Sequence, residues 1–139
     1  MIGLPQATAD IARIRSHRLK IYFDGGCRPN PGAIEIAVVA RGQAYISRDV
    51  GYGTSNDAEW LALIEAVRIA LSLGKPDFVL IGDSATVVNQ ANGLWKCRSA
   101  DLQNHLRAFR DLTLSLGKVQ IRQVKRSQNL AGIALARSH

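Results

Sequence analysis

An unbroken apolar run at Phe78–Ile81 constrains the fold most, because it stands between two stretches with helical periodicity. A short strand that is apolar on both faces is typical of a parallel strand covered by helices. The helical patterns are Asn56–Leu73, followed by the stop signals Gly74 and Pro76, and Ser84–Asn92. This order of segments predicts a layered α/β domain.

The remaining segments complete a mixed sheet. Alternation of apolar and polar residues predicts a first strand at 19–24, and turn residues fill 25–32. Two runs at 36–40 and 44–50 predict an antiparallel hairpin. Later elements are predicted as a helix at 100–116, a strand at 119–124 and a helix from about residue 128. The sequence therefore predicts a five-stranded mixed sheet, with the first three strands antiparallel and the later ones parallel, flanked by helices.

Length and composition favour one folded unit. With 139 residues, 47% of them hydrophobic, the chain can bury one sizeable core. We expect a domain at 18–139 and an N-terminal extension at 1–17 that includes a short helix around 8–14 or remains loose. No apolar run suits a membrane span, and the start lacks the pattern of a secretory signal. Together with the two cysteines, Cys27 and Cys97, which fit reduced thiols, these features predict a cytoplasmic protein.

The positive charge is confined to the last third of the chain. Residues 1–94 contain nine basic and nine acidic side chains, whereas residues 95–139 contain nine basic and two acidic ones, which accounts for the net charge of +7. A phosphate backbone would be attracted to such a surface, and the attraction would weaken as salt rises. A solvated basic face explains the same charge equally well.

Glu59 is the most informative polar residue of the predicted helix at 56–73. At 100° per residue it shares a face with Ala62, Leu63 and Ala66, so the pattern predicts an inward-pointing carboxylate. A buried carboxylate is costly without a partner. A metal ion, an arginine or the backbone amides of the helix start would each serve.

Asp24 and Asp83 favour the metal among these partners. Each stands where an apolar strand ends, and ligands of α/β sheets gather at the carboxyl ends of strands. Taken singly, Asp83 is explained as a helix cap and Asp24 as a turn residue. Three carboxylates that include Glu59 would repel one another at one sheet end unless Mg²⁺ or Mn²⁺ neutralised them. The pattern predicts a site for a hard divalent cation.

Three stretches of the sequence resemble the type 1 ribonuclease H family: DGGCRPNPG at 24–32, TSNDAEWLAL at 54–63 and GDSATVVNQANGLWK at 82–96. They occur in the family's order and spacing, and the resemblance extends over 19–137. It implies the ribonuclease H-like fold and a Mg²⁺-dependent endonuclease that cleaves the RNA strand of RNA/DNA hybrids. The implied chemistry is hydrolysis assisted by two metal ions, Mg²⁺ or Mn²⁺.

The resemblance also implies roles for individual residues. The carboxylates Asp24, Glu59 and Asp83 match the family's metal ligands, with Asp24 bridging two ions. Positions matching contacts to the hybrid in its minor groove or to the RNA backbone are Gly25, Gly26, Asn30 and Asn56. Trp95 and Lys96 match the region that binds the DNA strand, although a packing role explains Trp95 equally well. Contact with the RNA 2′-hydroxyl lets such a site distinguish RNA from DNA.

Two positions depart from the family pattern. The family carries a fourth Asp in its final helix, but the matching segment here is NLAGIALA, 129–136, which places Ile133 at that position. Asn129, as a neutral oxygen ligand, or more remotely Glu35, is the candidate replacement. The preceding loop, 125–128, lacks the histidine that many members use for proton transfer or product release. Arg126 fills that role in part or binds phosphate.

Two functions follow from these departures. The first is a working ribonuclease H, slower than its relatives or dependent on Mn²⁺, because loss of a supporting group commonly costs about 10–100-fold. The second is a hybrid-binding module that has lost catalysis. The enzyme is favoured, since carboxylates at 24, 59 and 83 oppose phosphate binding unless they hold metal. The expected partner is an RNA/DNA hybrid; no membrane or obligate protein partner is indicated, and a monomer is expected.

Overall fold

A computed structural model describes residues 18–74 and 77–139. The predicted N-terminal extension at 1–17, with its short helix around 8–14, lies outside the described residues. Among the described helices, none combines the length and apolar character needed to cross a membrane.

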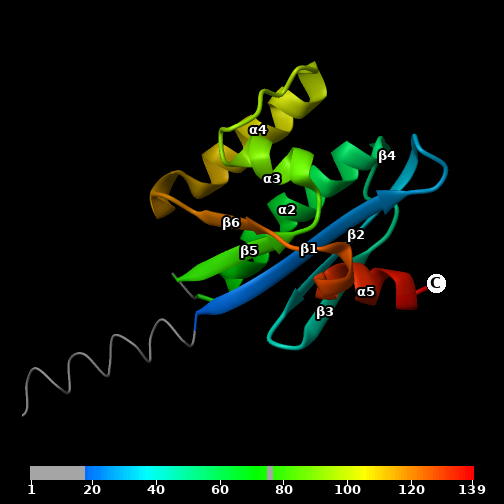
Figure 1. Ribbon diagram of the computed structural model, residues 1–139, viewed down its shortest axis with the longest axis horizontal. Helices are drawn as coiled ribbons and strands as arrows, with labels where there is room; N and C mark the ends of the chain where they lie inside the picture. Colours follow the sequence, from blue (N-terminus) through cyan, green and yellow to red (C-terminus); the bar gives the residue numbers. More distant parts are fainter. Residues whose placement is uncertain (1–17, 75–76) are drawn as a thin grey trace, which may run out of the picture.

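A mixed sheet forms the centre of the molecule (Figure 1). Strand β1 pairs antiparallel with β2, β2 antiparallel with β3, β1 parallel with β5, and β5 parallel with β6. The bounds along the order β3-β2-β1-β5-β6 are Gln43–Ser47, Gly32–Ala40, Leu19–Cys27, Phe78–Gly82 and Gln120–Gln123. The predicted five-stranded mixed sheet is confirmed. A sixth, two-residue strand, β4 at Tyr52–Gly53, pairs with β2 and was not predicted.

Helices cover both faces of the sheet. In Figure 1, α2, α3 and α4 lie on one side of β1 and α5 lies on the other. The bounds are Ser55–Ser72 for α2, Ala85–Ala91 for α3, Ala100–Thr113 for α4 and Leu130–Arg137 for α5. Short 3-10 turns, η1 at Leu114–Leu116 and η2 at Arg126–Gln128, follow α4 and precede α5. All four predicted helices are present.

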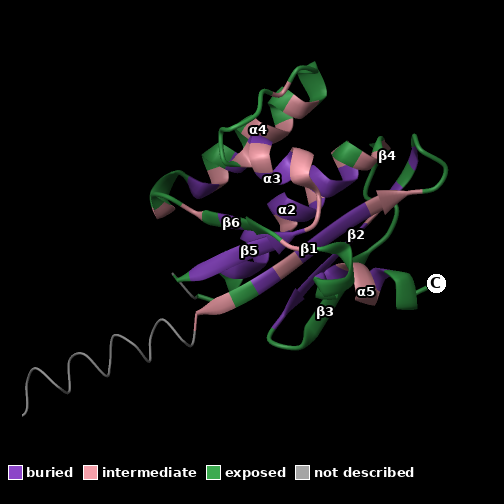
Figure 2. Ribbon diagram, in the orientation of Figure 1, coloured by how far each residue is buried: buried purple, intermediate pink, exposed green. Residues whose placement is uncertain are grey.

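Two apolar cores correspond to the two faces. The larger core packs Ile21 and Phe23 of β1 against Trp60 and Leu63 of α2, and all four side chains are fully buried. The smaller core joins residues of β2 to residues of α5, namely Ala37, Val39, Ala131 and Leu135. Every residue of β5 is buried, as Figure 2 shows, which agrees with the continuous apolar run in its sequence.

Helix α2 begins and ends where its sequence signals predict, within one residue. Thr54 caps its start: the Thr54 hydroxyl accepts from the Asp57 N–H at 3.2 Å, and the Asp57 carboxylate accepts from the Thr54 N–H at 2.9 Å. Beyond the other end, Gly74 has φ +67°, a left-handed conformation that glycine adopts readily. These signals fix the register of the helix, and with it the inward direction of Glu59.

Strand β1 continues past its predicted end. The sequence placed Gly25 and Gly26 in a turn, but they pair with Ile36 and Glu35 of β2, and the strand ends at Cys27. The turn prediction was wrong there because the partner strand β2 begins four residues earlier than expected, at Gly32. Asp24 therefore lies within a strand, and a rigid ladder rather than a loop holds it.

Candidate active site

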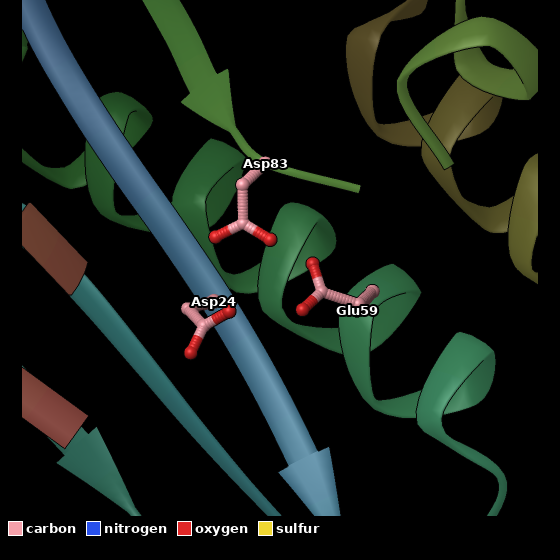
Figure 3. A group of neighbouring side chains, drawn as sticks. All are labelled: Asp24, Glu59 and Asp83. Carbon is pink, nitrogen blue, oxygen red and sulfur yellow. The ribbon is translucent and has the colours of Figure 1, made fainter. Parts of the chain in front are cut away.

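Three carboxylates from three different elements meet beside the sheet (Figure 3). Asp24 comes from β1, Glu59 from the second turn of α2 and Asp83 from the residue after β5. One oxygen of each lies within 4.8 Å of one oxygen of the others. The parallel register explains this, because Tyr22 pairs with Ile81 and the two aspartates each lie two residues beyond that pair. The sequence predicted this convergence.

The backbone at Gly25 orients Glu59. Its N–H donates to Glu59 Oε1 at 3.2 Å. A Cβ atom at Gly25 would lie 2.2 Å from the carbonyl oxygen of Ala58, so only glycine lets β1 approach α2 this closely. The other carboxylate oxygen, Oε2, is buried and has no hydrogen-bond partner among the described residues. An acceptor in that state is costly unless a cation or donor reaches it.

Burial and mutual repulsion control the protonation of the cluster. Burial, followed by the charge of Asp24, raises the pKa of Glu59 well above its ordinary value of 4.5. Burial also raises the pKa of Asp24 above 3.8, outweighing the lowering effects of Glu59 and Arg126. Both side chains are only 8% exposed. A bound cation would reverse these shifts by stabilising the ionised forms.

The donor set fits a divalent cation. Each of the three residues offers a carboxylate oxygen, the ligand type that Mg²⁺ and Mn²⁺ prefer. The unpaired Glu59 Oε2 points to a missing positive partner inside the cluster. Neither an arginine nor a lysine forms an ion pair with these carboxylates among the described residues. Of the partners considered for Glu59, a metal ion fits the structure, and the backbone N–H that reaches Glu59 Oε1 comes from Gly25 of β1 rather than from the helix start.

Asn129 connects the cluster to α5. It is fully buried and caps the helix through its Oδ1, which accepts from the Ala131 N–H at 3.1 Å. Its Nδ2 donates to the carbonyl oxygen of Phe23 at 3.0 Å and to Asp83 Oδ2 at 2.7 Å. The amide orientation is determined, because a carbonyl can only accept and a backbone N–H can only donate. Asn129 thus turns its nitrogen, not its oxygen, toward the carboxylates.

A cavity of about 260 Å³ opens over Asp24 and Glu59, and we call it the carboxylate cavity. Gly25, Gly26 and Arg126, which the sequence singled out, line it together with Asp24 and Glu59. Residues that the sequence reasoning did not select also line it, namely Cys27, Arg28, Ser55, Gly132, Leu135, Ala136 and His139. Glu35, the remote candidate for a fourth ligand, lines it too, but both of its oxygens already have partners, in Arg48 and His139.

Helix α5 presents Gly132 to Asp24. A Cβ atom at Gly132 would lie 3.5 Å from Asp24 Oδ2, an ordinary contact distance. Ile133, at the aligned position of the family's fourth Asp, is half-buried and is not among the residues that line the carboxylate cavity. The described part of α5 therefore brings no acidic group to the site.

A second cavity, of about 490 Å³, lies beyond the start of α2, between α3 and the segment that leads into α4. Asn56, Trp95 and Lys96, which the sequence singled out, line it together, although the sequence reasoning had grouped Asn56 with Asn30 and not with Trp95 and Lys96. Four further lining residues were missed, namely Thr86, Gln90, Arg98 and Leu102. Thr86 and Gln90 are four residues apart on α3, so a helical-face analysis would have found them. Trp95 is 51% exposed, so a buried packing role does not explain it. We call this space the α3–α4 cavity.

Asn30 lies in the loop between β1 and β2 and supports the start of α2. Its Oδ1 accepts from the Ser55 N–H at 3.1 Å and lies 3.7 Å from the Cys27 Sγ. This contact satisfies one of the free N–H groups of the helix start. The loop and the helix are thereby fixed to each other at the rim of the carboxylate cavity.

Comparisons with known proteins agree with this fold. The family described as "reverse transcriptase-like" matches residues 22–139. A ribonuclease HI from Halobacterium salinarum is 34% identical over 93% of this chain and 67% of its own length. Its crystal structure matches with a TM-score of 0.78 at 32% identity, over 85% of this chain and 93% of that one.

Two further relatives extend the comparison. A bifunctional protein of Mycobacterium tuberculosis is 29% identical over 86% of this chain, which spans 34% of the relative's length. The ribonuclease H domain of that protein matches with a TM-score of 0.73 at 27% identity, over 86% and 96% of the two chains. LC11 ribonuclease H1, solved with an RNA/DNA hybrid, has the same fold. It matches with a TM-score of 0.77 at 24% identity, over 85% of this chain and 93% of that one.

Proposed function

The chain belongs to the ribonuclease H family of enzymes, and from this premise we propose that it hydrolyses the RNA strand of RNA/DNA hybrids in a metal-dependent reaction. The observation that carries the proposal is the carboxylate cluster, in which Asp24, Glu59 and Asp83 approach within 4.8 Å and Glu59 Oε2 has no partner. The relatives supply the substrate class, since LC11 ribonuclease H1 is described with a bound hybrid.

Asp24, Glu59 and Asp83 would hold two Mg²⁺ or Mn²⁺ ions, which when bound activate the attacking water and neutralise charge at the leaving 3′ oxygen. The protein's part is to keep the three carboxylates in place. The Gly25 N–H fixes Glu59 Oε1 and leaves Oε2 for the cation. Asn129 fixes Asp83 by donating to its Oδ2. We infer that Asn129 positions a ligand and is not itself a ligand, because its own oxygen is used by Ala131.

The two cavities suggest how the hybrid lies on the protein. Ser55 and Glu59 line the carboxylate cavity, whereas Asn56 lines the α3–α4 cavity, so the start of α2 separates the two spaces. We place the RNA strand over the carboxylates, where Gly26 leaves open space above the backbone. The DNA strand then lies along Trp95 and Lys96, where an exposed indole offers stacking and an ammonium offers charge to phosphate.

The rate is expected to be lower than that of relatives with four carboxylates, with a preference for Mn²⁺. The described residues of α5 place Gly132 opposite Asp24 and no acidic group at the site. The positive charge of Arg126 acts to lower the pKa of Asp24, and Arg126 lines the carboxylate cavity. We assign it a phosphate contact near the metal site. A cytoplasmic location accords with the two free thiols, Cys27 and Cys97.

The alternative is a hybrid-binding module that has lost catalysis, favoured by the missing fourth carboxylate. A cleavage assay separates the two functions. The RNA strand of a hybrid is labelled and incubated with the protein in Mg²⁺ and, separately, in Mn²⁺, beside single-stranded RNA and double-stranded DNA. Cleavage of the hybrid alone supports the enzyme. Binding of the hybrid without cleavage in either metal would establish the module instead.

Matched variants assign any activity to the carboxylate cluster. Asp24→Asn and Glu59→Gln are expected to abolish cleavage, because each removes a negative ligand while keeping the shape of the side chain. Glu65→Gln, six residues further along α2 and paired with the exposed Arg68 at 3.5 Å, is expected to keep the parent rate. Equal activity in Glu59→Gln and Glu65→Gln would place the reaction elsewhere on the protein.

A further inference from the structure

A histidine lies at the carboxylate cavity, although the sequence lacks one in the loop that precedes α5. His139 follows α5, and its spacing of seven, four and three from Gly132, Leu135 and Ala136 keeps it on the same helical face. All four of these residues line the cavity that contains Asp24 and Glu59. The side chain of His139 is 37% exposed, so it faces both the cavity and solvent.

Glu35 fixes the ring of His139. The Nε2 atom of His139 lies 2.5 Å from Glu35 Oε1, and the side chain of Glu35 is only 14% exposed. Glu35 stands on β2 and pairs with Gly26, two residues beyond Asp24 in β1. The strand pairing that holds Asp24 therefore also determines where the histidine is held.

Arg48 contacts both Glu35 and Ser138, the residue before His139. It donates to Glu35 Oε2 at 2.8 Å, and its second terminal nitrogen donates to the carbonyl oxygen and the Oγ of Ser138, at 2.9 and 2.7 Å. One guanidinium thus anchors both the carboxylate and the backbone that carries His139. Because a carboxylate oxygen accepts, Nε2 of His139 is the donor in its contact with Glu35. In the tautomer that carries its proton on Nε2, the Nδ1 atom is left as the acceptor.

The other described histidine is not available for this site. His105 lies on α4, where its Nε2 is 3.0 Å from the Asp57 carboxylate and its ring stacks on Trp60. The other polar side chains that line the carboxylate cavity are carboxylates, arginines, a thiol and a hydroxyl. Among the described residues, His139 is the one imidazole at the cavity, and imidazole is the side chain best suited to exchange protons near neutral pH.

We propose that His139 is the proton-transfer residue of the hydrolysis and that Glu35 is its positioning residue; this rests on the proposed function. In the step, the water oxygen forms a bond to phosphorus and the bond from phosphorus to the 3′ oxygen breaks. Nδ1 of His139 takes one proton from the attacking water. That proton then passes to the 3′ oxygen, so a 3′-hydroxyl and a 5′-phosphate leave and the ring returns to its neutral form. A carboxylate behind the ring stabilises the intermediate imidazolium.

Kinetics of His139→Ala test the proposal. Cleavage of a saturating hybrid is expected to slow about 100-fold, the lower range for loss of a general acid or base, while hybrid affinity in metal-free buffer stays at the parent value. Added imidazole is expected to restore part of the rate, because it replaces the lost ring. A merely structural role for His139 would not respond to imidazole. Glu35→Gln is expected to slow cleavage about 10–100-fold.

A second measurement does not depend on activity. Nitrogen NMR of the imidazoles in the metal-free protein is expected to show His139 protonated on Nε2, and a mixture of tautomers in Glu35→Gln. His105 supplies the internal control, because it contacts Asp57 and not Glu35 and its signals should not change. If His139 has the same tautomer in the parent and in Glu35→Gln, the positioning role of Glu35 is wrong.

The outcomes separate this proposal from the proposed function. If the parent cleaves hybrid and His139→Ala cleaves at the same rate, only the role of His139 is wrong. If the parent cleaves nothing in Mg²⁺ or Mn²⁺, the proposed function is wrong and the role of His139 falls with it. Arg68→Ala removes an exposed basic side chain from α2, outside both cavities, and is expected to retain the parent rate with and without imidazole.

Discussion

Glu59 lies where one helix, one strand and one neighbouring charge act on the same carboxyl group. Burial and Asp24 raise its pKa, while the single N–H of Gly25 offsets only part of that effect. In the metal-free protein the cluster therefore retains a proton that an exposed glutamate would have lost. A cation must displace that proton to bind, so metal affinity is linked to pH.

This protonation predicts that the metal-free protein loses stability as pH rises. Between 4.5 and the higher pKa of the folded state, the folded chain binds more protons at Glu59 than the unfolded chain does. The stabilising contribution of Glu59 is therefore fully present below pH 4.5 and is lost as pH rises from 4.5 through the pKa of the folded state. Once pH exceeds both pKa values of Glu59, each unit of difference between the folded and unfolded pKa lowers the free energy of unfolding by about 1.4 kcal/mol.

Thermal unfolding in EDTA across this pH range measures the effect. The midpoint of the parent is expected to fall with rising pH, the fall should be smaller in Glu59→Gln, and Glu65→Gln should follow the parent. Mg²⁺ or Mn²⁺ should raise the midpoint most at high pH, where the carboxylates are ionised. A parent midpoint that is flat in EDTA and unchanged in Glu59→Gln would contradict the assignment.

Residues differ in how far the sequence determines their role. The places of Glu59 and Asp83 could be predicted, because helical periodicity and the end of an apolar strand are local features. Asp24 was placed at a strand end, but β1 continues to Cys27. The direction of the Asn129 amide could not. It depends on the carbonyl of Phe23, 106 residues away, and on the Ala131 N–H at the start of its own helix. The sequence suggested an oxygen ligand, whereas these two contacts turn the nitrogen to Asp83.

At the scale of elements, α5 determines what faces the metal site. The sheet was predictable from alternation and from the apolar run of β5, but the exact rotation of α5 was not. That rotation follows from the burial of Ala131 and Leu135 against β2, and it presents Gly132 to Asp24. An ungapped alignment places the missing carboxylate one residue further along, at Ile133.

The rotation of α5 predicts which substitution returns a fourth carboxylate. Gly132→Asp places a Cβ atom at an ordinary distance of 3.5 Å from Asp24 Oδ2, with its carboxylate at the cluster. We expect tighter Mg²⁺ binding, by about 10–100-fold, and a lower unfolding midpoint in EDTA because a like charge is added. Ile133→Asp is expected to gain less, since Ile133 does not line the cavity.

Isothermal titration with Mg²⁺ and the cleavage rate check this prediction together. Gly132→Asn is the uncharged control: it has the size of the aspartate and is expected to gain no metal affinity. A larger gain in Ile133→Asp than in Gly132→Asp would mean that α5 rotates when metal binds and that the aligned position is the ligand position.

Across the whole molecule, negative and positive charge are separated. The carboxylates gather at the sheet end, and the last third of the chain carries the entire net charge of +7. Lys96 and Arg98 bring part of that charge to the α3–α4 cavity, on the far side of the start of α2 from Glu59. Gln90 supports the backbone there, donating to the carbonyl oxygen of Lys96 at 3.1 Å and accepting from the Trp60 indole at 3.0 Å. Trp60 belongs to the larger core and lies on α2 beside Glu59, so this core fixes the α3–α4 cavity relative to the carboxylate cluster.

This separation predicts how salt affects hybrid binding. A polyanion bound by cationic side chains releases counterions, so the logarithm of affinity falls linearly with the logarithm of salt concentration. Lys96→Ala with Arg98→Ala is expected to reduce that slope by about two, one for each lost phosphate contact. Trp95→Ala is expected to lower affinity by about 1–3 kcal/mol with the slope unchanged, because stacking carries no charge.

Fluorescence anisotropy of a labelled hybrid, titrated in metal-free buffer at several KCl concentrations, gives both quantities. Arg68→Ala is the matched control: it loses one exposed cation outside the α3–α4 cavity and should keep the parent slope and affinity. If Arg68→Ala reduced the slope as much per charge as the double variant does, binding would follow net charge alone. A reduced slope confined to the double variant would instead locate a phosphate path at the α3–α4 cavity, beside the start of α2.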